Sequence, residues 1–506
     1  MKSQPYFLTV KIMSMQIDKI PTFFLIITLF IVSFGIYANS LQGDFLVDDI
    51  TTIQKDERIH DLGLYLSDHF KLTHNILNEV IRAFIWHLGK DNPFFYHLFN
   101  VLVNAACVVL VFVLCQTLFV NKTLSVLSSL IFAVHPIHTE VVSWISGGAY
   151  ALSSLFFMLT FIFYIKSYRS FLNLILTVIS FVICFFVGNS VVVLPILFII
   201  YDLFFREKNP QDKAMIRFRV IFLTSMIILS GLVAAYFFIN QNKFMHMIFY
   251  YRGFKYLVVI AKAFVYYLKI LYLPYQRGLY HPFAFNTTRI QDLSPALFLS
   301  LSLLIGIIIS FFKCRRKIPP ISFGIGFFCV TYLPYSNIIP IANIISERYL
   351  YLPSAGFSII MAALFLKAWE IINKKQNHRL FFRRLALIAL VLFIGSYSIL
   401  TLKQNYEYHD IITYWRSNIN NFPDGYTVYN NLAGTYYVMG NIKNAIAYCR
   451  VNLMVNPNQP HVWYNLGKVL EKSGDIKQAT MCYENVLKLD KGYFPAYEAL
   501  EKIKKY

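Results

Sequence analysis

Residues 95–118 read FYHLFNVLVNAACVVLVFVLCQTL, a run of 24 residues without a charged side chain. About 20 apolar residues in a helix are enough to span the roughly 30 Å hydrocarbon core of a bilayer. Ten other stretches of the chain are similarly apolar, and they lie near residues 21–38, 124–140, 149–165, 171–187, 190–205, 216–239, 294–312, 319–337, 350–370 and 385–402. The sequence therefore predicts an all-α, polytopic membrane protein with about eleven transmembrane helices.

The composition of the whole chain supports this class. Of its 506 residues, 57% are hydrophobic and only 14% are charged, whereas about a quarter of the residues of a soluble domain are charged. An ordinary soluble enzyme, a disordered tail and a fibre are therefore excluded. The net charge of +20 comes mostly from short basic clusters between apolar runs, not from a polar face for nucleic acid. The seven cysteines have no spacing suited to zinc or to a disulfide framework.

The basic clusters predict the orientation of the chain, because cytoplasmic loops carry an excess of Lys and Arg. The amino terminus is expected in the cytoplasm, and everything after about residue 403 on the external or lumenal side. The stretch 256–272 is read as an interfacial segment, because counting it as a span would place the basic cluster 313–317 outside. The first run lacks a cleavage site and is expected to be a retained signal anchor. Both a bacterial plasma membrane and an endoplasmic reticulum membrane fit this topology.

Beyond the last apolar run the chain is polar and repeats with a period of 34. The positions in register are Tyr429, Trp463 and Tyr497; Leu432, Leu466 and Leu500; Gly440 and Gly474; and Ala445 and Ala479. This pattern resembles the tetratricopeptide repeat, whose helix pairs stack on one another. We therefore expect a membrane domain over 1–402, a linker over 403–425 and a short α-solenoid over 426–506, with two full repeats and one helix. It serves either as a packing device or as a groove for an extended peptide.

The acidic residues near the membrane surface are candidate functional groups, since ionisable side chains at membrane depth are costly and often functional. Asp48 and Asp49 follow the first apolar run directly, in the first external loop. Two neighbouring carboxylates at an apolar boundary raise the pKa of one of them, which suits proton transfer or metal ligation. The alternative is an ordinary solvated turn.

A second cluster lies at the outer end of the third run, in the segment HPIHTE at 135–140. His135, His138 and Glu140 could hold a phosphate or a metal ion, or orient a sugar. The alternative is that Pro136 ends the helix and both histidines make interfacial hydrogen bonds. As a metal site the segment is weak, because three ligands from one short segment rarely converge without a further partner.

A third cluster, Arg348 and Tyr349, precedes the tenth run. The guanidinium fork matches the oxygens of a lipid-linked phosphate, although an arginine flanked by tyrosines could equally anchor a helix at the interface. The predicted topology places all three clusters on one face of the membrane, which favours a shared site.

These residues carry a resemblance to a known family. An acidic pair after the first helix resembles the glycosyltransferases of the GT-C fold, in which an acid of the first external loop lies at the catalytic centre. The segments HPIHTEVVSWISG (135–147), FYHLFN (95–100) and RYLYLPS (348–354), together with the terminal repeats, are similar to the transmembrane and tetratricopeptide repeat-containing O-mannosyltransferases and their bacterial relatives. The resemblance covers nearly the whole chain.

The resemblance implies that a sugar, typically mannose, is transferred from a polyprenyl or dolichyl phosphate to Ser or Thr hydroxyls of proteins on the external or lumenal face. The catalytic base would be Asp48 or Asp49. The substrate-binding residues would be His135, His138, Glu140, Arg348 and Tyr349, with the arginine neutralising the departing phosphate. The partners would be the lipid-linked sugar phosphate, an acceptor protein or peptide held by the repeats, and membrane lipids, but not nucleic acid. No cofactor is certain, and a divalent cation remains open.

The sequence departs from the family at two places. The family usually continues with Gly-Arg-Ala-Asp, where this chain has Gly-Gly-Ala-Tyr at 147–150, so that Gly148 and Tyr150 replace charged residues. The family often opens the sixth span with Lys-Glu, where this chain has Gly-Asn-Ser around Asn189. A catalytically inactive, membrane-anchored scaffold is therefore the alternative function. A transporter for lipid-linked sugar ranks third, because no inverted repeat is evident.

Overall fold

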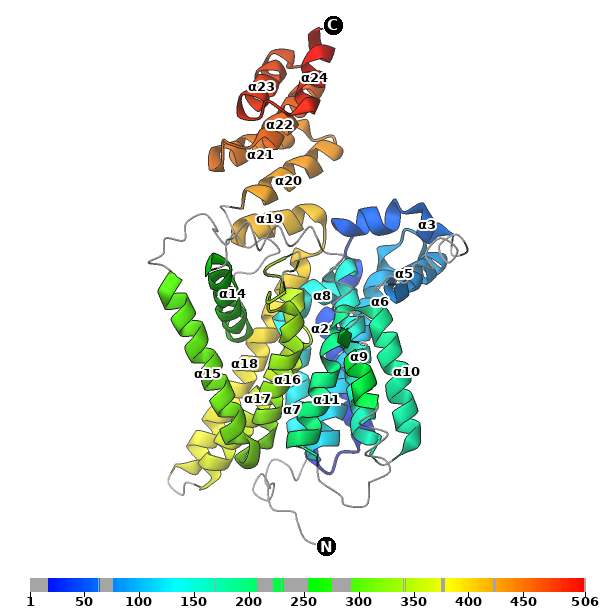
Figure 1. Cartoon of the computed structure of the whole chain (residues 1–506), viewed down its shortest axis with the longest axis vertical. Coiled ribbons are helices and arrows are strands. Elements are labelled where there is room, and N and C mark those ends of the chain that lie inside the picture. The colour runs from blue at the N-terminus through cyan, green and yellow to red at the C-terminus, as the bar shows by residue number, and fades with distance from the viewer. Residues whose placement is uncertain are drawn as a thin grey trace. The chain divides into compact units, whose positions relative to one another are not determined.

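The computed structural model describes residues 17–61, 63, 76–168, 170–206, 222–228, 230–231, 254–274, 293–339, 341, 343–374, 378–421 and 425–504 (Figure 1). Every regular element among these residues is a helix, which confirms the predicted all-α class for this part of the chain. They form two compact units, of which the first ends at Tyr406 and the second begins at Glu407.

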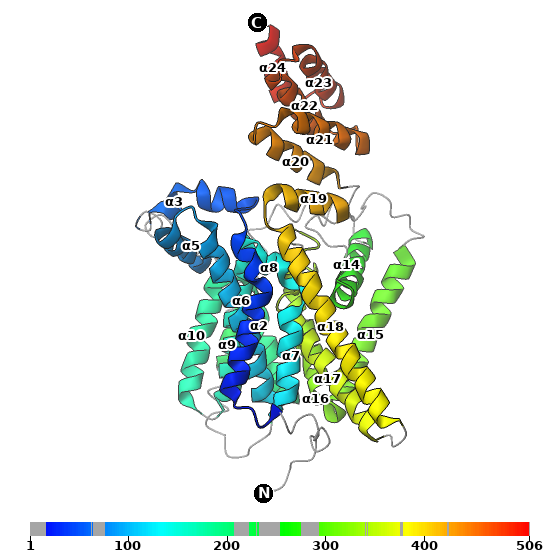
Figure 2. The same ribbon diagram turned by 180° about the vertical axis from the view of Figure 1, so that it is seen from behind.

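The centre of the first unit is a group of closely packed helices. They are α2 (Thr22–Tyr37), α6 (Pro93–Phe119), α7 (Lys122–Val134), α9 (Gly148–Lys166), α16 (Pro319–Tyr332) and α17 (Pro353–Lys374). Helix α6 packs against α2, α7 and α9, and α17 packs against α7 and α16 (Figures 1 and 2). Phe112, Phe132 and Phe157 are buried between them. Apolar side chains thus form the interior as well as the outer surface of the unit.

Glycine determines how closely α16 and α17 approach each other. A Cβ atom on Gly356 would lie 2.5 Å from the carbonyl oxygen of Gly324, and one on Gly324 would lie 2.7 Å from the carbonyl oxygen of Gly356. In lipid, helices gain most of their association from such close packing, because lipid tails are as apolar as the side chains.

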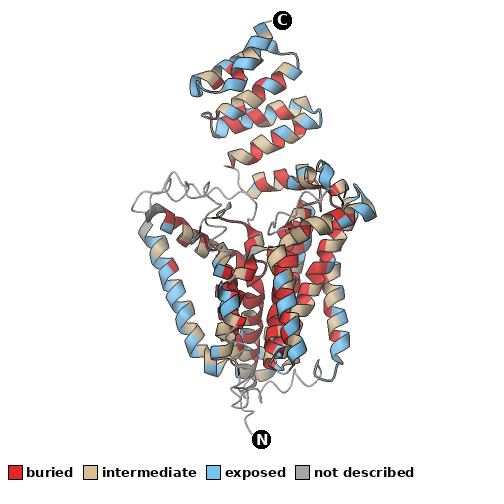
Figure 3. Cartoon of the chain, turned by 45° about the vertical axis from the view of Figure 1, so that its right-hand side comes forward, coloured by how far each residue is buried: buried red, intermediate tan, exposed pale blue. Residues whose placement is uncertain are grey.

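The remaining helices of the first unit surround this centre. They are α3 (Glu57–His60), α5 (Ile76–Gly89), α8 (Thr139–Ser143), α10 (Phe171–Val187), α11 (Leu194–Phe204), α14 (Phe254–Tyr272), α15 (Leu293–Lys317) and α18 (Arg379–Glu407). Only 11% of the apolar window of α15 and of α18 is buried, against 61% for α6, and Figure 3 shows this difference in exposure. Apolar side chains so exposed suit contact with lipid.

Six helices in the described ranges are long and apolar enough to cross a membrane. They lie at Thr22–Gln42, Pro93–Phe119, Ile145–Lys166, Leu297–Lys317, Pro353–Lys374 and Arg379–Glu407. A bent pair, Lys122–Val134 with Pro136–Ser143, would make a seventh. The membrane class is supported, but the predicted total of eleven spans is not confirmed. Much of the predicted run 216–239 lies outside the described residues, and 256–272 forms α14, which is not one of the six.

The bend in that pair is 54°, and its cause is local. Pro136 has no backbone N–H to continue α7, and the ring Nδ1 of His135 accepts a hydrogen bond from the backbone N–H of Ile137 at 3.1 Å. Short helices follow at Pro136–His138, α8 and Ile145–Gly147 before α9 begins. This broken stretch lets polar residues from consecutive turns point into the unit.

The second unit contains α19 (Ile411–Asn421), α20 (Tyr426–Val438), α21 (Ile442–Val455), α22 (Pro460–Lys472), α23 (Ile476–Leu489) and α24 (Phe494–Lys504). Helices α20 to α24 are the two pairs and one further helix that the 34-residue period predicts. The segment predicted as a linker, 403–425, holds the end of α18 and the whole of α19.

Three glycines allow the tight turns and the close helix packing of the repeats. Gly440 and Gly474 end α20 and α22 with φ of +77° and +86°, a left-handed conformation that glycine adopts without the penalty of a Cβ atom. Within α22, a Cβ atom on Gly467 would lie 2.5 Å from the ring of Tyr483. The small residue at this position therefore lets α23 pack directly against α22.

Candidate functional site

The two neighbouring aspartates have opposite environments. Asp49 is fully buried. One carboxylate oxygen accepts a hydrogen bond from the backbone N–H of Leu46 at 3.0 Å, and the other accepts from the backbone N–H of Ser146 at 2.9 Å and from its hydroxyl. Burial raises the pKa of Asp49 from its ordinary 3.8 to about 6, and these hydrogen bonds and the charge of Arg82 offset only part of the rise. Asp49 can therefore exchange a proton near neutral pH.

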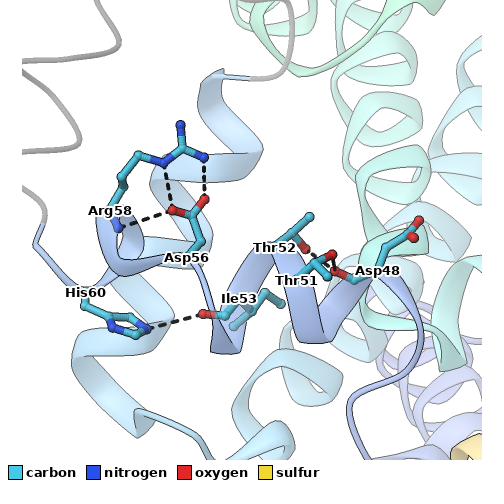
Figure 4. Close-up of polar contacts among 7 residues, drawn as sticks. All are labelled: Asp48, Thr51, Thr52, Ile53, Asp56, Arg58 and His60. Atoms are coloured by element: carbon cyan, nitrogen blue, oxygen red, sulfur yellow. Dashed lines mark hydrogen bonds and ion pairs between the residues drawn. The ribbon is translucent and has the colours of Figure 1, made fainter. Parts of the chain in front are cut away.

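Asp48 is exposed, and Figure 4 shows its backbone carbonyl beside the side chains of Thr51 and Thr52. Its backbone carbonyl accepts hydrogen bonds from the hydroxyls of Thr51 and Thr52, at 3.0 and 2.8 Å. Thr51 and Thr52 belong to the short π-helix Ile50–Gln54, so these bonds tie its first turn to Asp48. The structure thus distinguishes Asp49, which is buried, from Asp48, which is exposed, whereas the sequence left both as candidate bases.

Glu140 forms a buried ion pair with Arg348. The guanidinium Nη1 lies 2.8 Å from Glu140 Oε1, and the backbone N–H of Arg348 donates to Oε2 at 3.0 Å. The hydroxyl of Ser346 also donates to Oε1 at 2.8 Å. The side chains of Glu140 and Arg348 are only 2% and 11% exposed. The pair joins α8 to the short helix Glu347–Leu350, 208 residues further along the chain.

Both predicted histidines are buried and hold helices together. The Nε2 of His135 lies 3.1 Å from the carbonyl oxygen of Leu271, and that of His138 lies 2.7 Å from the hydroxyl of Ser354. Because this hydroxyl donates its hydrogen to the carbonyl of Tyr351 at 2.6 Å, the Nε2 of His138 must be the donor. Their predicted role in sugar binding remains a prediction.

No group of three His, Cys, Asp or Glu residues in the described part of the chain could hold a metal ion. The segment 135–140 instead supplies an ion pair through Glu140 and two interhelical hydrogen bonds through His135 and His138. A divalent cation in this chain also remains a prediction.

Aromatic rings surround the guanidinium of Arg348. Its central carbon lies 5.3 Å from the ring centre of Trp144, 5.5 Å from that of Tyr150 and 5.6 Å from that of Tyr349. Tyr349 in turn stacks on Tyr335, with ring centres 4.8 Å apart and planes inclined by 8°. The predicted Arg348–Tyr349 cluster is therefore a packed cation–π assembly, built around the ion pair.

A cavity of about 250 Å³ lies between this aromatic assembly and Asp49. Its lining residues are Asn78, Glu79, Arg82, Ser146, Ala149, Tyr150, Ser153, Val187, Gly188 and Tyr335. Ser146 connects the cavity to the carboxylate of Asp49, to which it donates two hydrogen bonds. Tyr150 and Tyr335 connect it to Arg348 and Tyr349. Asp49, Arg348 and Tyr349 do not line the cavity themselves; they contact residues that do, namely Ser146, Tyr150 and Tyr335.

Sequence reasoning missed Glu79 and Arg82, the two charged residues of the cavity lining. They lie three residues apart on α5, in the loop between the first two predicted spans, where no motif pointed to them. Burial raises the pKa of Glu79, and the positive charges of Arg82 and Arg58 lower it. The one available signal was a helical spacing that places both side chains on the same face.

Two residues of the segments that depart from the pattern of the resembled family, Tyr150 and Gly188, line this cavity. A Cβ atom on Gly148, a third such residue, would lie 1.9 Å from the side-chain oxygen of Asn100, whose amide nitrogen donates to the carbonyl oxygens of Trp144 and Ile145. A larger residue at 148 would therefore require Asn100 to move.

The second unit has a cavity of its own, of about 430 Å³. It is lined by Tyr437, Tyr464, Lys468, Glu471, Lys472, Tyr483, Pro495, Glu498, Ala499 and Lys502. Tyr483 donates a hydrogen bond to Glu471 at 2.9 Å, and Lys502 lies 3.6 Å from the same carboxylate. The ammonium of Lys472 lies 4.7 Å from the ring centre of Tyr437. This mixture of rings and charges suits a polypeptide.

The fold and the site define a class: a membrane protein with several apolar helices, a buried acid beside a polar cavity, and a helical repeat unit. A family model described as tetratricopeptide repeat matches residues 460–493, which are α22, α23 and the turn that follows. The predicted repeat is thereby confirmed.

The chain is similar to proteins named as O-mannosyl-transferases. It is 24% identical to protein O-mannosyl-transferase TMTC3 of Homo sapiens over 88% of this chain and 53% of the relative. It is 25% identical to protein O-mannosyl-transferase F38B6.6 of Caenorhabditis elegans, over 90% and 61%, and 23% identical to protein O-mannosyl-transferase TMTC4 of Mus musculus, over 85% and 66%. The predicted resemblance is confirmed in this form. The chain spans about half the length of the human relative.

Proposed function

We propose that this chain is a GT-C-type membrane glycosyltransferase that transfers mannose from a polyprenyl or dolichyl phosphate to Ser or Thr hydroxyls of proteins. The observation that carries the proposal is the buried Asp49, which accepts hydrogen bonds from Ser146 in the cavity lining and has a pKa raised to about 6 by burial. The names of the relatives support the same activity. By the positive-inside pattern, this site would face the outside of the cell or the lumen.

In the proposed reaction, the acceptor hydroxyl oxygen attacks the anomeric carbon of the mannose while its proton passes to the carboxylate of Asp49. The bond from the anomeric carbon to the phosphate oxygen breaks, and its electron pair leaves with the phosphate. A base whose pKa lies near the working pH is ionised often enough to accept a proton and basic enough to hold it. Ser146 would keep the carboxylate oriented through its two hydrogen bonds.

The other predicted residues would shape the site. Glu140 and Arg348 would hold the segment before α17 against α8, so that Tyr349 stacks on Tyr335, which lines the cavity. The cavity of the second unit would hold the acceptor protein as an extended segment, since its tyrosines and lysines offer apolar and hydrogen-bonding contacts.

The test is transfer of radiolabelled mannose from polyprenyl phosphate mannose to acceptor peptides by the reconstituted protein. Asp49→Asn should abolish transfer, whereas Asp48→Asn should retain it. If neither the unaltered protein nor any variant transfers sugar, while deletion of 426–506 removes the cellular function, the chain is a membrane-anchored scaffold instead. The observation that favours this second function is that Tyr150 and Gly188, uncharged residues of the two segments that depart from the family pattern, line the cavity.

A further inference from the structure

Helix α5 is fixed in place beside the cavity. The side-chain amide of Asn78 donates to the carbonyl oxygen of Val187, at the end of α10, at 2.8 Å. At its other end, the ring of Trp86 stacks on His60 with ring centres 3.8 Å apart. Between these two contacts, Glu79 and Arg82 line the cavity. Helix α5 therefore holds both charged side chains at the cavity.

Arg82 is the only cation among the described residues that line this cavity. Its charge acts on two acids, because it lowers the pKa of both Asp49 and Glu79. The guanidinium is thus close to the proposed base and to the cavity space. No ion pair shorter than 4 Å involves Arg82 within the described ranges, in contrast to Arg348, whose Nη1 is bound to Glu140.

We propose that Arg82 binds the phosphate group of the lipid-linked donor. This inference rests on the proposed function and names the residue that recognises its donor. A guanidinium offers two parallel N–H donors that match two phosphate oxygens. A phosphate placed there would lie beside the base, as transfer from phosphate to an acceptor hydroxyl requires.

Two residues of the segments that depart from the pattern of the resembled family, Tyr150 and Gly188, line the same cavity without adding charge. Arg82 and Glu79, both on α5, are the basic and the acidic side chain of its lining.

The experiment measures binding of a fluorescent short-chain polyprenyl monophosphate, and of the corresponding uncharged polyprenol, to the full-length protein in detergent. Arg82→Gln should weaken binding of the monophosphate roughly ten-fold or more, since a charge-assisted hydrogen bond is lost, and leave polyprenol binding unchanged. Unchanged polyprenol binding also demonstrates that the variant is folded. Arg82→Lys should lose less, because a point charge remains.

Arg58→Gln is the matched control. The charge of Arg58 also acts on Glu79, but Arg58 does not line the cavity, pairs with Asp56 at 2.6 Å and is 51% exposed (Figure 4). This variant therefore removes a nearby positive charge without removing the guanidinium of the cavity, and it should bind both lipids normally. Monophosphate binding by Arg82→Gln equal to that of the unaltered protein would overturn the proposal. So would displacement of the lipid by inorganic phosphate at equal concentration, because the site would then recognise a free anion.

Failure of the binding site and failure of the proposed function give different results. If Arg82→Gln loses monophosphate binding but the unaltered protein transfers no mannose, the binding site stands and the transferase function does not. If the unaltered protein transfers mannose and Arg82→Gln binds the monophosphate normally, the transferase stands and the assignment of Arg82 is overturned.

Discussion

Replacing Asp49 by Asn tests the proposed base through two independent quantities. The first is the rate of transfer. General base catalysis contributes about 10²-fold to 10⁴-fold to a rate, so Asp49→Asn should lower kcat by at least about 100-fold. The amide keeps the size of the carboxylate, but its one carbonyl oxygen can accept from either Leu46 or Ser146 and not from both, because the other end of the amide is a donor. This lost hydrogen bond is the same at every pH, so the pH dependence of rate and stability reports the missing carboxylate.

The second quantity is stability. The rise of the Asp49 pKa from 3.8 to about 6 means that ionising this group costs about 3 kcal/mol more in the folded protein than in water. Between these two pH values the folded state keeps a proton that the unfolded state has lost. The unfolding free energy therefore falls as the pH rises from about 4 to about 6. An asparagine at this position removes that loss.

Thermal unfolding of both proteins in the same detergent, at one scan rate and at several pH values, measures this effect as a difference. Asp49→Asn should gain stability over the unaltered protein as the pH rises from 4 to 7, by up to about 3 kcal/mol. The transfer rate of the unaltered protein should rise over the same range, with a midpoint near pH 6.

Asp48→Asn is the control, because this exposed residue lies next to Asp49 in sequence. It should change neither the rate nor the pH dependence of stability appreciably. An Asp49→Asn protein that transfers mannose at a near-normal rate would refute the assignment of the base. A stability difference that does not change with pH would refute the argument that Asp49 is desolvated.

Three further variants test the packing of residues inside each of the two units, two in the first unit and one in the second. Glu140→Gln should leave the arginine of its ion pair buried without a carboxylate and destabilise the first unit by about 3–5 kcal/mol, seen as a lower unfolding temperature; an unchanged temperature would contradict the pairing. Gly148→Arg, which restores the residue of the family, should lower both stability and transfer, because even a Cβ atom would lie 1.9 Å from the side chain of Asn100; a gain in activity would contradict this. Gly467→Ala should destabilise the repeats by about 1–3 kcal/mol, since its methyl group would lie 2.5 Å from the ring of Tyr483, and circular dichroism of the purified protein during heating measures it; normal melting would show that α22 and α23 can move apart.

The features that could be predicted from sequence are those encoded by local periodicity. Uncharged runs such as 95–118 need only a count of consecutive residues, and that run is present as α6. The repeats need only a comparison at a separation of 34, and Gly440 and Gly474 do occupy equivalent turns with positive φ. In both cases the determining contacts lie within or between neighbouring helices, so sequence spacing carries the information.

The features that could not be predicted depend on contacts between distant segments. Asp48 and Asp49 are adjacent and chemically identical, and their difference arises because Ser146, 97 residues away, donates to one of them. Glu79 and Arg82 were missed for the same reason. Nothing in their neighbourhood shows that α5 packs beside the end of α10, where Asn78 donates to a carbonyl 109 residues away.

Arg348 shows most clearly why the identity of a residue does not determine its role. The family resemblance implies that it neutralises the departing phosphate, yet its charge is already balanced by Glu140 at 2.8 Å. A buried ion pair contributes little net stability, but it is costly to break, so it serves best to hold two segments in one geometry. A donor phosphate would then need a second cation, and Arg82 is the cation that the described lining of the cavity offers. The two arginines therefore have different roles: Arg348 holds two segments together, and Arg82 binds the phosphate. Loss of Arg348 should disturb the fold, whereas loss of Arg82 should leave the fold intact and remove recognition of the phosphate.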